Sequence, residues 1–600
     1  MLTKQTLVMY GLVWAGLGLC SACGSSDGSN AASGGASSAL GGAGGALAKG
    51  GAGGSGGALP SSGDCDEPAI TCADLNGTLR SNGALRANSV CTLTSQLEVE
   101  AGVTLCLERG VTIRSKDGWI RVAGNLEVRG SEAAPVVFTS VADPEHGGSG
   151  SPSASDWIGI SFEPGSSGSI AHATLRYVEE AIHTDRASPP LSHIRIEKCG
   201  IAINAAVDDE LTLDDVRASD CTSNGLWRRP GTIDKRASWA ETALPQIITQ
   251  SVRIGSSGSL TIGAGVVAKF QFGSAFSVAG ELRVEGEQAS GRQVVFTSLS
   301  DDSRGGPSYL RGGVAPVLGE WPGIQFEPGS TGSLRHAEVH FAETGVYVDG
   351  ASPSLSDVKV SHSGHALSVA ADDHLEIATF SASDCSINGL LRRPSTLHGS
   401  VAWNETGVVQ VIPETIEIAT DASLSIGSGA VLKFMPLSSL QVKGQLRINP
   451  DTAAIEPAIL TSILDDTLGG PTNGVGGDQP YLGDWVGVVF ESSSSGGARN
   501  AQILYAASGI RANSAAPSIV SSLFKYNSAG VWAAGVNARP VVTQSSFLHN
   551  GTGAGAENGG QVVAESNWWG AADGPGGSAN GSGQSVTSDV DYTPFLTAPP

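Results

Sequence analysis

The chain has 600 residues, a formal net charge of −23 and a mean hydropathy of +0.03. An acidic excess of this size argues against nucleic acid and against polyanions such as pectate as partners, although it leaves room for a local basic groove. The 82 glycines, set against 35 lysines and arginines together, favour a turn-rich β fold over a helical one.

Residues 1–23 have the features of a bacterial lipoprotein export signal. After Lys4, the apolar run from Leu7 to Leu19 is too short to span a bilayer, which needs about 20 residues. The following Ser21-Ala22-Cys23 resembles a lipobox, whose cysteine carries the lipid, although Cys20 stands where leucine is usual. The alternative is a secretory peptide cleaved nearby. We expect lipid attachment at Cys23 and, because no aspartate follows it, an outer-membrane anchor that faces the periplasm or the outside.

Residues 24–63 consist almost entirely of glycine, serine and alanine, with stretches such as Gly41-Gly42-Ala43-Gly44-Gly45. A segment of this composition cannot bury enough apolar surface to fold. We therefore expect a flexible tether that holds the folded body about 35 Å from its anchor.

Four cysteines follow, at Cys65, Cys72, Cys91 and Cys106. In an exported chain they predict two disulfides over an N-terminal cap, and four cysteines allow three pairings. A metal site is the alternative, but these cysteines include no CxxC pair and no clustered histidine.

From about residue 94 onward, the pattern is one of short strands. Leu260-Thr261-Ile262, Phe276-Ser277-Val278 and Leu282-Arg283-Val284 are typical, because each is short and apolar and is followed by glycine or polar turn residues. Strands of this length fit either a sandwich array or a parallel solenoid. The solenoid is favoured because strand groups recur about every 20–24 residues and most strand pairs have no Asn-Gly hairpin signal between them.

A longer repeat is marked by an acidic residue followed by Trp-x-Gly. It occurs at Asp156-Trp157-Ile158-Gly159, at Glu320-Trp321-Pro322-Gly323 and at Asp484-Trp485-Val486-Gly487, with an offset of 164 residues each time. The same offset relates Arg228-Arg229-Pro230 to Arg392-Arg393-Pro394. The body of the chain is therefore expected to consist of three tandem modules.

Cys199 and Cys221 lie 22 residues apart, which is close to one coil of such a solenoid. They are predicted to stack on adjacent coils within bonding distance. Cys385 takes the place of Cys221 in the next module, and it has no such mate because Ser363 occupies the position that matches Cys199.

The body also resembles a known family. Leu260-Thr261-Ile262-x-Ala264-Gly265-Val266-Val267, Val278-Ala279-Gly280-Glu281-Leu282 and Val295-Phe296-Thr297-Ser298 look like bacterial right-handed parallel β-helix proteins of the pectin-lyase-like superfamily. Together with the repeat, the resemblance predicts an all-β fold, a right-handed parallel β-helix (solenoid) built from three tandem modules of about 160 residues. It does not indicate an activity, because the superfamily mixes lyases, hydrolases, epimerases and adhesins.

The end of the chain resembles the closing segment common in that group, at Ser566-Asn567-Trp568-Trp569-Gly570. A stack must cover its last open edge, and bulky aromatic side chains serve that purpose. The expected organisation is a signal peptide (1–23), a tether (24–63), a cysteine-containing cap (64–93), three β-helix modules (94–250, 251–414 and 415–564) and a closing segment (565–600).

Two acidic pairs, Asp301-Asp302 and Asp465-Asp466, lie in glycine-rich insertions shortly before Trp321 and Trp485. Together with backbone carbonyls they could ligate calcium, which is the one cofactor that the sequence suggests. The alternative is that they are solvated turn residues, in which case no cofactor is expected.

Further carboxylates repeat at the spacing of one coil. Asp185 precedes Asp208-Asp209 by 23 residues, and Asp349 precedes Asp372-Asp373 by the same number, so these side chains could line one face. Paired acids are what glycoside hydrolysis needs.

Basic residues accompany both acidic sets. Arg229 and Arg393 follow about one coil later and could bind an anionic sugar or balance the acids. With His398-Gly399 behind the second set, the order Asp, Asp-Asp, His-Gly is similar to that of polygalacturonase-type hydrolases.

Other features argue against a catalytic face. His398 has no counterpart in the first module, where Asp234 stands, and the third module lacks the acids. Enzymes rarely carry two copies of one site, whereas a stacked structural feature repeats. Ion pairs between coils, formed by Asp208 or Asp209 with Arg228 or Arg229, would explain the duplication.

These patterns lead to a functional hypothesis. We expect a lipid-anchored β-helix at the cell surface that serves display, adhesion or glycan binding rather than turnover. The alternative is a polysaccharide lyase or glycoside hydrolase that acts on an acidic polysaccharide with the Asp–Arg face. The expected partners are outer-membrane lipid, through the acylated N-terminus, and a polysaccharide, with no nucleic acid, and the protein is expected to be a monomer.

Overall fold

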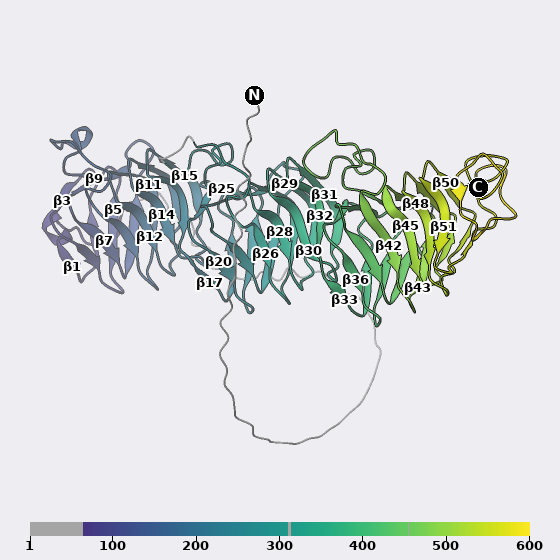
Figure 1. The fold of residues 1–600 in the computed structure, drawn as a ribbon. Helices are drawn as coiled ribbons and strands as arrows, with labels where there is room; N and C mark the ends of the chain where they lie inside the picture. Colours follow the sequence, from purple (N-terminus) through teal and green to yellow (C-terminus); the bar gives the residue numbers. More distant parts are fainter. Residues whose placement is uncertain (1–63, 310–313, 454) are drawn as a thin grey trace, which may run out of the picture. The chain divides into compact units, whose positions relative to one another are not determined.

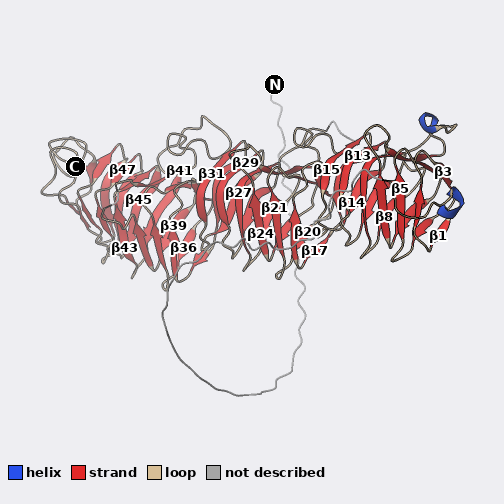
Figure 2. Cartoon of the chain, turned by 180° about the vertical axis from the view of Figure 1, so that it is seen from behind, coloured by secondary structure: helices blue, strands red, loops and turns tan. Residues whose placement is uncertain are grey.

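The computed structural model describes residues 64–309, 314–453 and 455–600. The predicted export signal, the lipid-attachment site at Cys23 and the tether over 24–63 lie outside the described residues. Within the described part, the helical elements are two 3-10 turns, η1 (Cys72–Leu75) and η2 (Pro144–His146), and neither has the length or the apolar character of a membrane span (Figure 2).

The described residues form a parallel β-solenoid of about 22 coils, so the prediction of a solenoid rather than a sandwich is confirmed. Strands one coil apart pair in parallel. In β10 (Gly159–Phe162), β12 (Glu180–Thr184) and β14 (Ile201–Ala205), for example, Ile160, Ile182 and Ile203 are in register. The strands follow one another in chain order from β1 (Gly77–Leu79) to β51 (Thr552–Glu557) along the stack (Figure 1).

Alternation of side chains along each strand fills the interior. In β10, Ile160 and Phe162 are buried while Ser161 between them is half-buried, as the two-residue period of a strand requires. Because every coil repeats this pattern, buried aliphatic side chains stack in columns. Each fully buried aliphatic side chain contributes about 1.5–3 kcal/mol to folding, so the columns rather than any single coil stabilise the body.

The tryptophan of the acidic-Trp-x-Gly motif has the same role in all three places. Trp157, Trp321 and Trp485 are each 1% exposed. Each indole N–H donates to a backbone carbonyl that lies 19 residues further along the chain, those of Arg176, His340 and Leu504. Trp321 also stacks on Phe270 with 4.2 Å between the ring centroids. The motif is therefore part of the core.

The glycine of the motif is required by the close approach of the next coil. At Gly159, Gly323 and Gly487 the backbone φ is positive, and an added Cβ would lie 1.6–1.7 Å from a carbonyl oxygen of the following coil. No side chain fits there. The acidic residue accepts a hydrogen bond from a buried serine of the preceding strand, as Asp484 does from Ser462 at 2.8 Å.

Equivalent strands of the repeat lie in different sheets. β12, β28 (Thr344–Val348) and β45 (Ala506–Asn513) occupy matching positions in the 164-residue repeat. β12 belongs to a 16-stranded sheet, β28 to a 13-stranded sheet and β45 to a nine-stranded sheet. The faces that the repeat duplicates therefore do not continue one another along the stack.

Two extra strands cause this shift. After β16 (Ser223–Arg228) the chain forms β17 (Gly231–Ile233) and β18 (Arg236–Trp239), which begin columns of their own. β19 (Gln246–Ile248) then continues the column of β16. The same event follows β32 (Ile387–Arg393), where β33 (Thr396–Leu397) and β34 (Ser400–Trp403) intervene before β35 (Gln410–Ile412).

Buried charge lies where these shifts occur. The apolar interior consists of three large clusters, which span residues 75–244, 207–390 and 371–590. At the first division Arg228 pairs with Glu241 at 3.0 Å, and at the second Arg392 pairs with Glu405 at 2.6 Å. Both arginine side chains are fully buried.

The described cysteines form three disulfides. Cys65 bonds to Cys106 and Cys72 to Cys91 at the N-terminal end of the described residues, which selects one of the three possible pairings. The predicted approach of Cys199 and Cys221 is confirmed by a disulfide between adjacent coils. Cys385 is buried and, among the described cysteines, it alone has a free thiol.

Candidate functional site

The predicted acids lie where strands of one sheet end. β12 ends at Thr184, so Asp185 follows it directly, and the turn after β14 holds Asp208 and Asp209. Arg229 comes directly after β16. The structure thus places the set on three successive coils, at the same edge of the sheet.

Arg229 connects these coils. Its guanidinium donates to the carbonyl of Thr184 at 2.7 Å and to Oδ1 of Asn204 at 3.2 Å. It also lies 3.7 Å from Oδ1 of Asp185 and 3.2 Å from Nε2 of His183. The arginine therefore holds one acid and two polar side chains of neighbouring coils together.

Arg393 has the corresponding position 164 residues further along the chain. It donates to the carbonyl of Val348 at 2.7 Å and to Oδ1 of Asp349 at 3.0 Å. Its guanidinium lies 4.2 Å from the centroid of the Tyr347 ring, within cation–π range. The pairing of this arginine with an acid therefore recurs, on a different sheet.

Asp209 is not open to a ligand. Its side chain is buried, and Oδ2 accepts hydrogen bonds from Oγ1 of Thr184 at 2.7 Å and from the backbone N–H of Ala206 at 3.1 Å. Asp208 beside it is exposed. The two acids therefore face different environments and do not form a pair.

Asp373, which matches Asp209 in the repeat, is half-buried rather than buried and has a different hydrogen-bond partner. Oδ2 of Asp373 accepts from the backbone N–H of Gly350 at 3.0 Å. Burial, reinforced by the neighbouring exposed Asp372, raises the pKa of Asp373 above its ordinary value. Asp349 is committed to Arg393, so it does not supply a second free acid.

The ion pairs have other partners than the sequence suggested. Arg228 does not pair with the carboxylate of Asp208 or Asp209: its Nε donates to Gln246 at 2.8 Å and its Nη2 to Glu241 at 3.0 Å. Asp209 offers Arg228 only its backbone carbonyl. Glu241 was missed because it lies after the strand shift, where the spacing of one coil no longer predicts neighbours.

His398 is separate from the second acidic set. Its ring is exposed, and Nδ1 lies 3.1 Å from Oδ1 of Asp421. Among the described residues, its side chain contacts none of Asp349, Asp372, Asp373 or Arg393. The polygalacturonase-like order of residues therefore does not become a polygalacturonase-like cluster.

The outward side of the same sheet carries a column of polar and aromatic side chains, which we call the outer column. Ser161, His183, Asn204 and Trp227 are in register on β10, β12, β14 and β16. Nδ1 of His183 lies 2.7 Å from Glu180. Sequence alternation places these residues outward, but it did not single them out.

A shallow cavity adjoins the outer column. It has a volume of about 280 Å³, and Trp119, Ile158, Ser161, Glu180 and His183 are among its walls. An apolar wall with a few fixed polar groups is the usual character of a ligand site. None of the aspartates of the row lines this cavity.

Columns with different residues occur at the positions that the 164-residue offset predicts. Gln325, Tyr347 and Ser368 are in register, and further along the chain Arg511 is in register with Trp532. Each column thus combines an aromatic ring with hydrogen-bonding side chains. Because equivalent strands lie in different sheets, the three columns do not share one face.

The aspartates proposed for calcium hold their loops closed. Asp301 is buried, with Oδ2 accepting from Thr297 at 2.7 Å and Oδ1 accepting from Ser303. Burial opposes ionisation, but the hydrogen bonds from Ser303 and Thr297 outweigh it and hold the pKa of Asp301 below its ordinary value. Its oxygens are therefore occupied.

The second acidic loop repeats this arrangement. Asp465 accepts from Thr461 at 2.7 Å and from Thr467 at 2.5 Å, and Asp466 accepts from the N–H of Gly477 at 2.8 Å. Asp302, in the first loop, is exposed. The alternative of solvated turn residues is thus wrong for the buried Asp301 and Asp465.

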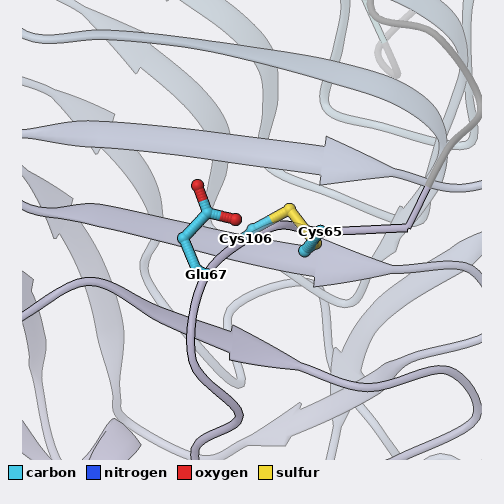
Figure 3. A group of neighbouring side chains, drawn as sticks. All are labelled: Cys65, Glu67 and Cys106. Atoms are coloured by element: carbon cyan, nitrogen blue, oxygen red, sulfur yellow. A yellow bond between two sulfur atoms is a disulfide. The ribbon is translucent and has the colours of Figure 1, made fainter.

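The N-terminal cysteines do not offer a metal site either. Within the described part of the chain, Cys65, Glu67 and Cys106 form the one group of potential metal ligands that lie close together. Figure 3 shows that the two sulfur atoms are joined in a disulfide beside the Glu67 carboxylate. Bonded sulfurs are not thiolates, so they cannot serve as ligands.

Comparison of the chain with protein families, with characterised proteins and with solved structures found no match. Any inference about function therefore depends on the geometry described above.

Proposed function

We propose that the protein is an exported β-helix scaffold that binds polysaccharide on the outer column and does not cleave glycosidic bonds. The observation that carries this proposal is the fixed geometry of Arg229, which contacts His183, Asn204 and Asp185. These contacts lie beside the cavity that Ser161 and His183 line. Side chains held in this way keep little conformational freedom, so a ligand loses less free energy in ordering them.

Polar and aromatic groups of the outer column suit a sugar. Trp227, at one end of the outer column, and Trp119, in the wall of the cavity, each provide flat apolar surface and an indole N–H donor, while Ser161 and Asn204 provide hydrogen-bonding groups. Arg229 adds a positive charge that an acidic polysaccharide would meet in an otherwise acidic protein. Acidic and neutral glycans are therefore both tested below.

Cleavage is not supported by the acids. A glycosidase needs two carboxyl groups that flank the scissile bond, one of them protonated. Asp209 is buried with Oδ2 bonded to Thr184 and Ala206, and Asp185 and Asp349 face arginines. Asp373 has a raised pKa, but Asp349 is paired with Arg393 and the exposed Asp372 is the adjacent residue in the same turn.

The test is direct measurement of binding and of cleavage with the full-length protein in detergent. Binding of a glycan panel should be weakened at least about tenfold by His183→Ala or Trp227→Ala, which corresponds to about 1.4 kcal/mol. Arg283→Ala, an exposed charge on β24 (Glu281–Glu285), is the matched control and should leave binding unchanged.

Cleavage products would decide against the proposal. If reducing ends or unsaturated sugars form, and Asp209→Asn or Asp373→Asn abolishes them in a folded protein, the lyase or hydrolase alternative replaces the scaffold. Binding that survives both outer-column substitutions would place the ligand on another part of the protein.

We also propose that the chain is anchored to the outer membrane through a lipid on Cys23. The support is the signal-like sequence of residues 1–23, followed by the glycine-rich segment that separates it from the solenoid. Cys23→Ser should release the protein into the soluble fraction, and Cys20→Ser should not. Membrane association that is lost with Cys20→Ser alone would contradict this assignment.

The finer details of the fold are part of the same proposal. Right-handed winding is supported by the strong preference of parallel crossovers for that hand. Three tandem modules are supported by two features that recur after 164 residues: the buried tryptophan of the acidic-Trp-x-Gly motif and the Arg228–Glu241 ion pair. A heavy-atom or cryo-electron density map that shows a left-handed coil would contradict the first part.

A further inference from the structure

A serine, a histidine and a glutamate meet on the outer side of β27 (Thr331–His340) and β29 (Ser354–Ser361). Nδ1 of His340 lies 2.8 Å from Oγ of Ser361. Nε2 of the same ring lies 3.4 Å from Oε2 of Glu338. The strands impose this arrangement, because His340 and Ser361 are in register and Glu338 precedes His340 by two residues on the same side.

The other contacts of the cluster define where the protons lie. Burial, together with the charge of Arg304, lowers the pKa of His340 below its ordinary value of 6.5, and Glu338 opposes this only in part. The ring is therefore neutral at pH 7. With its N–H at Nε2 toward Glu338, Nδ1 is free to accept the hydroxyl proton of Ser361.

Two basic side chains complete the surroundings. Arg304, from the loop after β25 (Val294–Ser298), lies 2.7 Å from Oε2 of Glu338 and holds that carboxylate in place. Nδ1 of His362 lies 3.0 Å from Oγ of Ser361, so a second imidazole also contacts the hydroxyl. Ser361 is half-buried and His362 is exposed, so a ligand can reach the hydroxyl from solvent.

The cluster occurs once, unlike the structural contacts of the repeat. The positions that match Glu338, His340 and Ser361 hold other residues in both remaining modules. These residues are Thr174, Arg176 and Glu197 in the first module and Gln502, Leu504 and Lys525 in the third. Arg176 and Glu197 also meet across two coils, at 3.6 Å, but as an ion pair, so the hydroxyl and imidazole together are particular to Ser361 and His340.

We propose that Ser361, His340 and Glu338 form a hydrolytic site for carboxylic esters. Oγ of Ser361 attacks the ester carbonyl carbon while its proton passes to Nδ1 of His340. When the carbon–oxygen bond of the leaving alcohol breaks, His340 returns that proton to the alcohol. Water then attacks the acyl-enzyme with His340 as base, which releases the carboxylic acid and restores the serine hydroxyl.

The remaining residues have separate roles in this step. Glu338 is a positioning residue that orients His340, and Arg304 orients Glu338. To His362, whose Nδ1 lies 3.0 Å from Oγ of Ser361, the proposal assigns the role of donor to the carbonyl oxygen as it becomes negative. At 3.4 Å, Nε2 of His340 and Oε2 of Glu338 do not form a hydrogen bond in this structure, and the proposed step requires this contact to tighten when substrate binds. The site shares no residue with the outer column, so either proposal can fail without the other.

The test is covalent labelling of the full-length protein with a fluorophosphonate, located by mass spectrometry of the peptides. The expected adduct is on Ser361, with loss of fluoride. Ser361→Ala should abolish it, and His340→Gln should slow it about 100-fold, which is the low end of what a general base provides. Ser383→Ala, at the paired position on the next strand, is the control and should label at the rate of the unmodified protein.

A second measurement separates catalysis from a structural role. Hydrolysis of p-nitrophenyl acetate should follow the same order of variants, and its rate should fall as the pH is lowered through the pKa of His340, below 6.5. The charged groups that face His340 are Glu338, Arg304, Asp301 and the neighbouring His362. Far-UV circular dichroism confirms that each variant is folded. Absence of an adduct at Ser361, or labelling that His340→Gln does not slow, would overturn the proposal.

Discussion

Arg228 and Glu241 form an ion pair inside the solenoid, with 3.0 Å between Nη2 and Oε2 and with both side chains at most 2% exposed. The remaining groups are also satisfied, because Nε of Arg228 donates to Gln246 and Oε1 of Glu241 accepts from the N–H of Leu211. Arg392 and Glu405 repeat the pair. The Arg228–Glu241 pair lies where β17 and β18 shift the columns, so it stabilises the position of the shifted coil.

Removal of one partner of this pair should be costly. Arg228→Met leaves the Glu241 carboxylate buried and unpaired, and we expect a loss of about 3–5 kcal/mol in the free energy of unfolding. The double variant Arg228→Met/Glu241→Leu should recover part of that loss, because no charge is left unpaired, although the buried N–H of Leu211 and the side chain of Gln246 lose a partner. Urea unfolding followed by fluorescence measures both. The exposed pair Arg217–Asp215 is the control, and Arg217→Met should change stability by less than about 1 kcal/mol. A double variant as unstable as the single one would contradict this account.

Lys269 should make stability depend on alkaline pH. Its side chain is buried, Nζ donates to the carbonyl of Gly306 at 2.6 Å, and burial lowers its pKa to about 8, which Asp302 and Asp301 oppose only in part. In the unfolded chain its pKa returns to about 10.5. Between these values the unfolded state binds more protons, so stability should rise with pH in that window, by roughly 3 kcal/mol at most.

The comparison with Lys269→Met isolates this effect. The unmodified protein should gain stability relative to the variant between pH 8 and 10.5. Lys443→Met, a half-exposed lysine paired with Glu417, should show no such difference from the unmodified protein. Parallel stability curves for the unmodified protein and Lys269→Met would refute the prediction.

The disulfide between Cys199 and Cys221 should stabilise its two coils. Replacing both residues with serine removes a cross-link over 22 residues, and we expect a loss of about 3 kcal/mol. Thermal unfolding should show the loss, and a reducing agent, which also acts on the Cys65–Cys106 and Cys72–Cys91 bonds, should lower the Tm of the unmodified protein by at least as much. Cys385→Ser is the control, because it removes a buried thiol that is not bonded. The reducing agent should lower its Tm by the same amount as it lowers that of the unmodified protein. An unchanged Tm in the double serine variant would count against a structural role for the bond.

The glycine of the acidic-Trp-x-Gly motif should tolerate no side chain. In Gly323→Ala the new Cβ would lie 1.6 Å from the carbonyl oxygen of Thr344, at a φ of +98°. The next coil would have to move, so we expect a loss well above the roughly 1 kcal/mol that a strained φ alone can cost. Gly329→Ala is the matched control, because its φ is +80° and no atom lies within 4 Å of the new Cβ. Equal destabilisation by the two substitutions, in thermal unfolding, would show that the contact is unimportant.

Much of the fold could be predicted from the sequence. Short strands with a two-residue period, repeated about every 22 residues, leave little choice but a parallel solenoid, since only stacking buries their apolar sides. The same regularity correctly brought Cys199 next to Cys221 and left Cys385 unpaired. It also placed Asp185, Asp209 and Arg229 on successive coils, because all of these predictions depend on neighbours one coil apart.

What the sequence could not decide is what happens where the coil spacing changes. The strands β17 and β18 shift the columns, and only the folded chain shows that Arg228 therefore meets Glu241 rather than an aspartate. The shift also sends β12 and β28 to different sheets. The meeting of Glu338, His340 and Ser361 depends on the register of two strands and on a loop that brings Arg304 over them. Local periodicity determined the coil, but side-chain partners depend on how coils and loops align, and that is a property of the tertiary structure.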